Sequence, residues 1–384
     1  MLLGACAFSS MASMRVCDAL LPALATEFGT TVGRAAQAVS FFALAYGLAQ
    51  LFYGPLGDRF GKLRVIGLAT LACTAGNAAA AFSTDMASLV ASRVLSGLAA
   101  AGVVPLTMAW IGDNVPYAHR QEVLARLLGA TVFGMISGQW LGGLIAQAAG
   151  WHAAFAVLAL LFLVCGVLLV AQSNRYEGPM TCVPSGGFAG RMRSVLMQPW
   201  ARVVLVVTGI EGAFVFGAVA FIPSYLHGRF GLSMPTAGAV VALYGVGGLV
   251  YSRCGRGLVR RLGEAGLARL GGCCLATAFA VIAVSPAWPP LLPACLLAGF
   301  GFYALHNTLQ THATQMAPGS RGTAVSLFAC TLFLGQSLGV LAAAWSLDRF
   351  SASLVFVLSS VAVLTLGFVF AAAASRQALL LKDA

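Results

Sequence analysis

Apolar segments of about 20 residues alternate with short polar segments along the whole chain. An α-helix rises 1.5 Å per residue, so about 20 apolar residues cross the roughly 30 Å of hydrocarbon in a bilayer. A membrane β-barrel would instead show short segments of alternating polarity, which the sequence lacks. We therefore expect an all-α membrane protein with twelve transmembrane helices. Their expected bounds are residues 2–26, 34–54, 63–83, 87–110, 125–148, 152–171, 202–227, 234–253, 266–284, 290–313, 322–346 and 352–374.

The charge content and its distribution agree with this interpretation. Only 9% of the residues are charged and 60% are hydrophobic, too few charges to cover a soluble protein of this size. The net charge is +11, but seventeen of the 22 basic residues lie in the loops after the even-numbered helices, within four residues of those loops, or near the C-terminus. This asymmetry follows the positive-inside rule and predicts cytoplasmic termini. Arginines spread over six loops form no groove for nucleic acid, so the expected partner is the lipid bilayer.

The longest polar interruption, residues 172–200, separates six expected helices from six. It predicts an N-terminal six-helix bundle at 1–171, a cytoplasmic linker at 172–200 and a C-terminal six-helix bundle at 201–384. The halves are weakly similar in sequence: Gly138-Gln139 corresponds to Gly335-Gln336, and the matched positions are offset by 197 to 202 residues. A duplication of six helices explains why the offset stays within this narrow range.

A loop of glycines and charged residues follows the second expected helix. Glycine permits a sharp turn and a close approach of two helix ends, and basic residues hold the loop on the cytoplasmic face. The pattern G-x-L-x-D-R-x-G-[RK]-x-[RK] at residues 54–64 resembles the loop between helices 2 and 3 of the major facilitator superfamily of secondary transporters. The loop residues singled out here are Gly54, Gly57, Asp58, Arg59, Gly61, Lys62 and Arg64. In the second half Arg260 stands in place of Asp58, so no equivalent carboxylate is expected there.

Two further motifs resemble the same superfamily. Arg93, four residues before Gly97, is similar to the helix-4 motif R-x-x-x-G, whose arginine is associated with proton handling; the alternative interpretation is a buried structural ion pair. The fifth helix resembles the antiporter motif G-x-x-x-G-P-x-x-G-G, with Gln139 where the family has proline. Small residues at this spacing allow another helix to pack closely. These glycines are Gly134, Gly138, Gly142 and Gly143.

Few charged side chains fall within the apolar segments. Arg15 and Asp18 are three residues apart on one face of the first helix, whereas Glu211 has no charged neighbour in its own helix. An unpaired carboxylate in apolar surroundings can take up and release a proton near neutral pH. Glu211 is therefore the first candidate for proton coupling and Asp18 the second, with Arg93 and Arg15 as further candidates. The alternative is a carboxylate that only bonds a facing helix.

Other polar residues in the apolar segments are candidates for the lining of a substrate cavity. His306 is expected to line the cavity or to form a core hydrogen bond, in preference to relaying protons. The ten cysteines have no metal-ligand spacing, so neither a metal nor a catalytic residue is expected. The candidate lining residues are Gln139, Tyr303, His306, Asn307, Gln310 and Gln336.

The resemblance covers essentially the whole chain. It implies two bundles related by a pseudo-two-fold axis along the membrane normal, which rock around a central cavity. The resulting hypothesis is a monomeric, proton-coupled exporter of a small amphiphilic compound in the bacterial cytoplasmic (inner) membrane. It would be driven by the proton gradient without a cofactor, and Asp58 and Arg59 would lock its outward-facing state. The alternative is an importer or facilitator of a sugar, an organic acid or another metabolite. An enzyme or sensor is disfavoured because no nucleophile, phosphate loop or soluble domain is evident.

Overall fold

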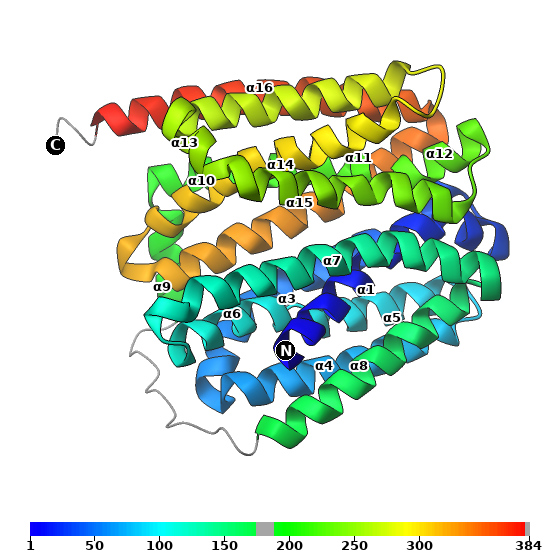
Figure 1. The fold of residues 1–384 in the computed structure, drawn as a ribbon, viewed down its shortest axis with the longest axis horizontal. Helices are drawn as coiled ribbons and strands as arrows, with labels where there is room; N and C mark the ends of the chain where they lie inside the picture. Colours follow the sequence, from blue (N-terminus) through cyan, green and yellow to red (C-terminus); the bar gives the residue numbers. More distant parts are fainter. Residues whose placement is uncertain (174–187, 381–384) are drawn as a thin grey trace. The chain divides into compact units, whose positions relative to one another are not determined.

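The computed structural model describes residues 1–173 and 188–380, and all regular elements in these ranges are helices (Figure 1). The chain divides into two compact units. The first comprises Met1–Ser185 together with Ser233–Ala239, and the second comprises Gly186–Leu232 and Val240–Ala384. Residues 174–187 of the expected 172–200 linker lie outside the described residues. The described part of the linker contains one short helix, α9.

The first unit is built from six long helices or helix pairs. Their bounds are α1 Leu2–Glu27, α2 Val32–Ala35, α3 Gln37–Phe60, α4 Lys62–Ala81, α5 Met86–Ala100, α6 Val103–Asn114, α7 Tyr117–Ala149 and α8 Trp151–Ser173.

The second unit begins with α9 and contains a π-helical turn, η1, and a 3-10 turn, η2. The bounds are α9 Phe188–Leu196, α10 Pro199–Glu211, η1 Gly212–Phe216, α11 Gly217–Val219, α12 Ile222–Phe230, α13 Met234–Val284, α14 Leu291–Gln315, η2 Pro318–Ser320, α15 Arg321–Arg349 and α16 Ala352–Leu380.

Nine helices of the described chain are long and apolar enough to cross a membrane. One of them, α13, bends at Gly263 and covers two expected spans, while α1 and α14 occupy two more. The segments therefore accommodate the twelve expected spans. Outward-facing side chains of α8 and α16, such as Leu160 and Val361, are 62% and 60% exposed and apolar. A bilayer covers such side chains, whereas water would not favour them.

The loop expected between residues 253 and 266 is helical except at Gly263. The intervening residues include leucine, arginine and valine but no proline, so nothing removes a helical backbone hydrogen bond. Gly263 has φ +65° and ψ −179°, a conformation open to glycine alone, and the helix turns there. In the first unit, Gly61 with φ +87° separates α3 from α4 in the same way.

Glycines on α7 form the contact with α1. Gly134 and Gly138 lie against the carbonyl oxygens of Phe8 and Ala12, so close that an added Cβ would overlap them. One turn further on, a Cβ at Gly142 would lie 2.9 Å from the Val16 side chain. The ridge of small residues expected from the sequence therefore lies along α1.

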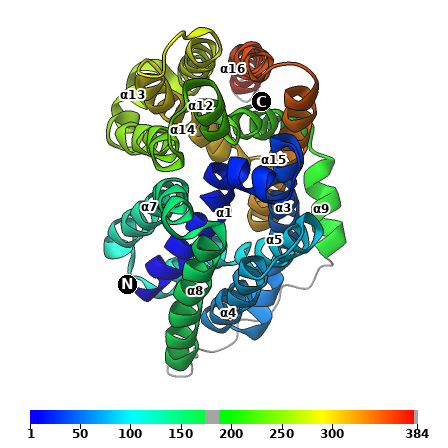
Figure 2. The same ribbon diagram turned by 90° about the vertical axis from the view of Figure 1, so that its right-hand side faces the viewer.

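The same unit contains two further close contacts. α4 and α8 lie side by side, as both views show (Figure 1, Figure 2). The first residues of α13 pack on α7, where a Cβ at Gly143 would lie 2.8 Å from the carbonyl oxygen of Met234. All four glycines of the expected motif are buried against backbone or aliphatic neighbours.

Asp85 begins α5 with a capping box. Its carboxylate accepts a hydrogen bond from the backbone N–H of Ser88 at 2.9 Å, and the Ser88 hydroxyl lies 3.4 Å from the Asp85 backbone nitrogen. These contacts provide hydrogen-bond partners for backbone N–H groups at the start of the helix, which have no partner within the helix itself. The backbone hydrogen bond from Ser88 lowers the pKa of the Asp85 carboxyl below its ordinary value.

Candidate functional site

A buried carboxylate lies at the end of α10. Glu211 is completely buried, and its Oε2 atom lies 2.9 Å from Nδ1 of His306 on α14. The imidazole stacks on the Phe302 ring at 4.8 Å between centroids and also contacts the Phe328 ring of α15. The pair therefore joins α10 to α14 within the second unit, and aromatic rings cover it. Sequence reasoning listed both residues separately and did not pair them.

The second oxygen of this carboxylate, Oε1, has no hydrogen-bond partner among the described residues. The π-helical turn η1 follows at once, and Gly212 lies against the α15 backbone at Leu332 and Gln336. Within the described chain, the buried side-chain oxygen of Gln336 also lacks a hydrogen-bond partner. A buried acceptor without a donor costs free energy, and π turns are frequent at functional sites. A proton or a donor group that reaches this region gains hydrogen bonds.

The second candidate carboxylate, Asp18 on α1, is also completely buried. Nη1 of Arg15 lies 3.4 Å from its Oδ2 atom, one helical turn away, as the spacing predicts. Gln139 of α7 faces the same carboxyl group from the position where the antiporter motif has proline. A cation within its own helix therefore balances the charge of Asp18, in contrast to Glu211.

Arg93 on α5 is completely buried. Its guanidinium donates to the Ser13 carbonyl oxygen at 2.8 Å, to the Ser13 hydroxyl at 3.3 Å and to the Ala38 carbonyl oxygen at 3.5 Å. The ring of Phe42 lies 4.2 Å from the guanidinium carbon. Carbonyl, hydroxyl and aromatic groups make the direct contacts of the guanidinium, while Asp18 interacts with it electrostatically without a salt-bridge contact among the described residues.

In the Gly54–Arg64 loop, Lys62 is the centre of the charge pairing. Its Nζ atom lies 2.6 Å from Asp113 Oδ2, at the end of α6, and 3.4 Å from Asp58 Oδ1. The side chain of Lys62 is only 17% exposed, whereas Asp58 and Asp113 are 43% and 57% exposed. The loop is thus tied to α6 by an ion pair that shields the lysine from solvent.

The other residues of this loop have separate surroundings. A Cβ at Gly57 would lie 2.5 Å from the Leu106 side chain, so this glycine brings α3 close to α6. The guanidinium of Arg59 lies 5.1 Å from the centroid of the Phe60 ring. Arg64 is exposed, and Gly54 has open space at its Cα.

The remaining candidates on α14 do not form one cluster. Tyr303 is half-buried, and the Asn307 side chain faces the Tyr251 hydroxyl of α13. Gln310, expected on the same face as His306, is exposed. The structure therefore joins His306 to Glu211 and leaves Gln310 apart.

Three polar residues escaped the sequence reasoning. Ser13 bonds both Arg93 and the Asn77 side chain of α4, the latter at 3.1 Å between Ser13 Oγ and Asn77 Oδ1. Their signal was present, because both are polar residues inside apolar segments. Asp113 lies three residues beyond the fourth expected span, and its partner Lys62 lies 51 residues away, so no local spacing connects them.

The sequence profile described as Major Facilitator Superfamily matches residues 3–340. With the all-helical fold and the charged loop between α3 and α4, this match identifies the class. The chain belongs to the Major Facilitator Superfamily and is a multi-pass membrane transporter.

Similar proteins are found at low identity. An uncharacterized MFS-type transporter, YwfA of Bacillus subtilis, is 25% identical over 245 residues, which cover 62% of this chain and 59% of that protein. A chloramphenicol resistance protein of Streptomyces lividans is 27% identical over 341 residues, covering 87% of this chain and 85% of the relative. A solved structure of a POT-family peptide transporter has a TM-score of 0.81 at 16% sequence identity. The match covers 98% of this chain and 96% of the transporter's chain, so the two proteins share the fold.

Proposed function

We propose that this transporter exports a small amphiphilic organic compound in exchange for protons, by alternating access. The observation that carries the proposal is the buried Glu211–His306 contact of 2.9 Å. Charge on a completely buried carboxylate is unfavourable unless it is paired, so proton uptake and release at Glu211 alter the contact between α10 and α14. Coupling of transport to protons requires a contact between helices that changes with protonation, and this contact between α10 and α14 is of that kind.

Two features support export as the direction of transport and the bacterial inner membrane as the location. Relatives in Streptomyces lividans and Pseudomonas aeruginosa are named chloramphenicol resistance proteins, which favours export of a small organic compound. The asymmetric distribution of basic residues supports cytoplasmic termini in the bacterial inner membrane. The proton gradient supplies the driving force without a cofactor, and the transporter acts as a monomer. Asp18 with Arg15 has a structural role in this scheme.

Glu211→Gln tests the proposal. A growth-inhibition screen that begins with chloramphenicol, in cells lacking their own exporters, identifies a transported compound. Uptake of that compound into inside-out vesicles is then followed together with proton release, using a pH-sensitive dye. We expect Glu211→Gln to lower proton-driven transport at least about tenfold, whereas Glu122→Gln, in an exposed 2.5 Å pair with Arg126, retains it. Unchanged coupled flux in Glu211→Gln would refute the assignment, and uptake by intact cells would establish import instead.

A further inference from the structure

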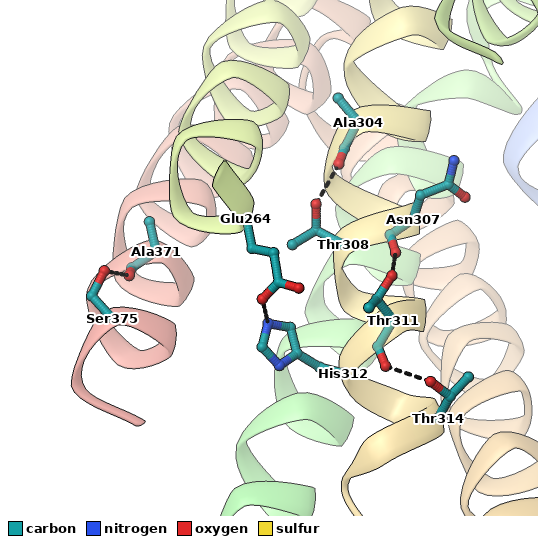
Figure 3. Close-up of polar contacts among 9 residues, drawn as sticks. All are labelled: Glu264, Ala304, Asn307, Thr308, Thr311, His312, Thr314, Ala371 and Ser375. Atoms are coloured by element: carbon teal, nitrogen blue, oxygen red, sulfur yellow. Dashed lines mark hydrogen bonds and ion pairs between the residues drawn. The ribbon is translucent and has the colours of Figure 1, made fainter. Parts of the chain in front are cut away.

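The bend of α13 brings a carboxylate to the end of α14. Gly263 turns the chain, Glu264 follows it, and Oε2 of Glu264 lies 3.1 Å from Nε2 of His312 (Figure 3). The side chain of His312 is 13% exposed and that of Glu264 is 50% exposed. The imidazole is thus mostly shielded, while its partner reaches it from the solvent side.

Aromatic rings enclose the other faces of His312. Trp200 of α10 meets it edge-on at 5.2 Å between centroids, and Phe370 of α16 at 5.4 Å. The hydroxyls of Thr308 and Thr311 donate to carbonyl oxygens of their own helix, so they do not compete for the imidazole (Figure 3).

Glu264 is the charged group found to interact with His312 among the described residues. The arginines at the same ends of the packed helices are exposed, and no ion pair or electrostatic interaction with His312 is found for them in the described ranges. These are Arg202 of α10, Arg260 and Arg261 of α13, Arg321 of α15 and Arg376 of α16.

The first unit contains the same arrangement with the charges reversed. There, Gly61 is followed by Lys62, which pairs with Asp113 at the end of α6. Residues 113 and 312 differ by 199 positions, and 61 and 263 by 202, both within the 197 to 202 offset of the internal repeat. Each unit therefore ties the residue after one positive-φ glycine, Gly61 or Gly263, to a residue near the end of its fourth expected helix. The first unit uses lysine with aspartate, and the second uses glutamate with histidine.

We propose that Glu264 and His312 form a proton-dependent latch, which closes on the cytoplasmic side of the second unit when His312 is protonated. Lysine and aspartate side chains, with ordinary pKa values of about 10.4 and 3.9, do not change charge between about pH 5 and 8. Histidine gains or loses its charge in that interval. The contact between Glu264 and His312 therefore weakens as the cytoplasmic pH rises, whereas the contact between Lys62 and Asp113 does not. This inference holds for export and import alike and does not depend on Glu211.

The test uses the full chain in lipid nanodiscs, with thermal unfolding followed from pH 5.5 to 8. We expect Glu264→Gln to lower the unfolding temperature by about 2 °C at pH 5.5 and by less than about 0.5 °C at pH 8. The matched control Glu122→Gln should show no such dependence on pH. The exchanged pair Glu264→Lys with His312→Asp copies the first unit, and we expect it to restore the unfolding temperature and remove the dependence.

Two results would overturn the proposal. One is a destabilisation by Glu264→Gln that is equal at both pH values, and the other is an exchanged pair no more stable than Glu264→Gln alone. A measurement on the unaltered chain guards against misfolded variants: NMR of labelled histidine should show the His312 ring gaining a proton as the pH is lowered. A ring that keeps one protonation state throughout contradicts the latch.

Discussion

Buried polar side chains in this transporter are satisfied in different ways. Arg93 bonds carbonyl and hydroxyl oxygens and stacks on Phe42, without a carboxylate in salt-bridge contact among the described residues. Glu211 instead has a histidine partner on another helix and one oxygen without a described partner. The arginine is held by several contacts, whereas the hydrogen bond found for the glutamate among the described residues goes to one imidazole.

Substitution of Arg93 by lysine tests whether the planar guanidinium is needed for these contacts. Lysine carries one ammonium and no planar fork, so it cannot bond Ser13 and Ala38 while stacking on Phe42. We expect Arg93→Lys to lower the unfolding temperature in detergent by about 5 °C, because a buried charge-assisted hydrogen bond contributes roughly 1.5–3 kcal/mol. The exposed control Arg126→Lys should change it by less than about 1 °C. An equal effect of the two variants would show that the fork is unimportant.

Sequence patterns found the chemistry of single residues better than their pairing. Glu211 and His306 were both singled out as polar residues in apolar segments, but 95 residues separate them, and helix packing decides that they meet. By contrast, Arg15 and Asp18 were paired correctly because a three-residue spacing fixes their common face. Local geometry is therefore readable from the sequence, and contacts between helices are not.

At the scale of helices, small residues decide how closely α1 and α7 approach. Gly138 touches the backbone of Ala12, whereas Gly129 on the same helix has open space at its Cα. The two glycines thus share a helix and differ in what an added methyl group would meet.

This pair gives a matched prediction. We expect Gly138→Ala to destabilise the protein by about 1–3 kcal/mol, because the new Cβ overlaps a carbonyl oxygen and α1 must shift. Gly129→Ala should be neutral or stabilise by up to about 1 kcal/mol through helix propensity. Denaturation of both variants in detergent measures the difference. Equal stability of the two would contradict a tight α1–α7 contact.

The start of α5 makes a prediction about pH. The Ser88 backbone N–H lowers the pKa of Asp85, so the carboxylate stabilises the folded state above its unfolded pKa. That stabilisation is lost as the pH falls through the lower pKa of the folded state. We therefore expect Asp85→Ala to lower the unfolding temperature at pH 6 and to have a smaller effect near pH 3. The control Asp85→Asn keeps a helix cap whose side chain does not titrate. An effect of Asp85→Ala that is the same at both pH values would show that the charge of the Asp85 carboxylate does not stabilise the fold.

At the scale of the whole chain, apolar length and the distribution of basic residues were enough to predict a helical membrane protein. The expected first span at 2–26 agrees closely with α1 at Leu2–Glu27. The helical conformation of the expected 253–266 loop on both sides of Gly263 was not foreseen, because positive charge there indicates a membrane boundary but does not end a helix. Arg260 stands where the first half has Asp58, and Glu264 follows the bend at the position that Lys62 has in the first half.

The same distribution of charge predicts the membrane topology. A green fluorescent protein fused after Ala384 should fluoresce, and alkaline phosphatase at that position should be inactive, because the C-terminus is expected in the cytoplasm. Phosphatase inserted after Gly231, in the turn between α12 and α13, should be active. The opposite pattern would reverse the orientation.

The π-helical turn after Glu211 preserves the helical phase of the rest of its membrane span. An α-helix advances about 100° per residue, and a π turn takes in one extra residue. Deleting one residue from Gly212–Phe216 would therefore restore a regular α-helix there and leave the phase of α12, with its contact between Arg229 and Tyr225, nearly unchanged. The π turn thus accommodates one extra residue without changing the direction in which α12 faces relative to Glu211.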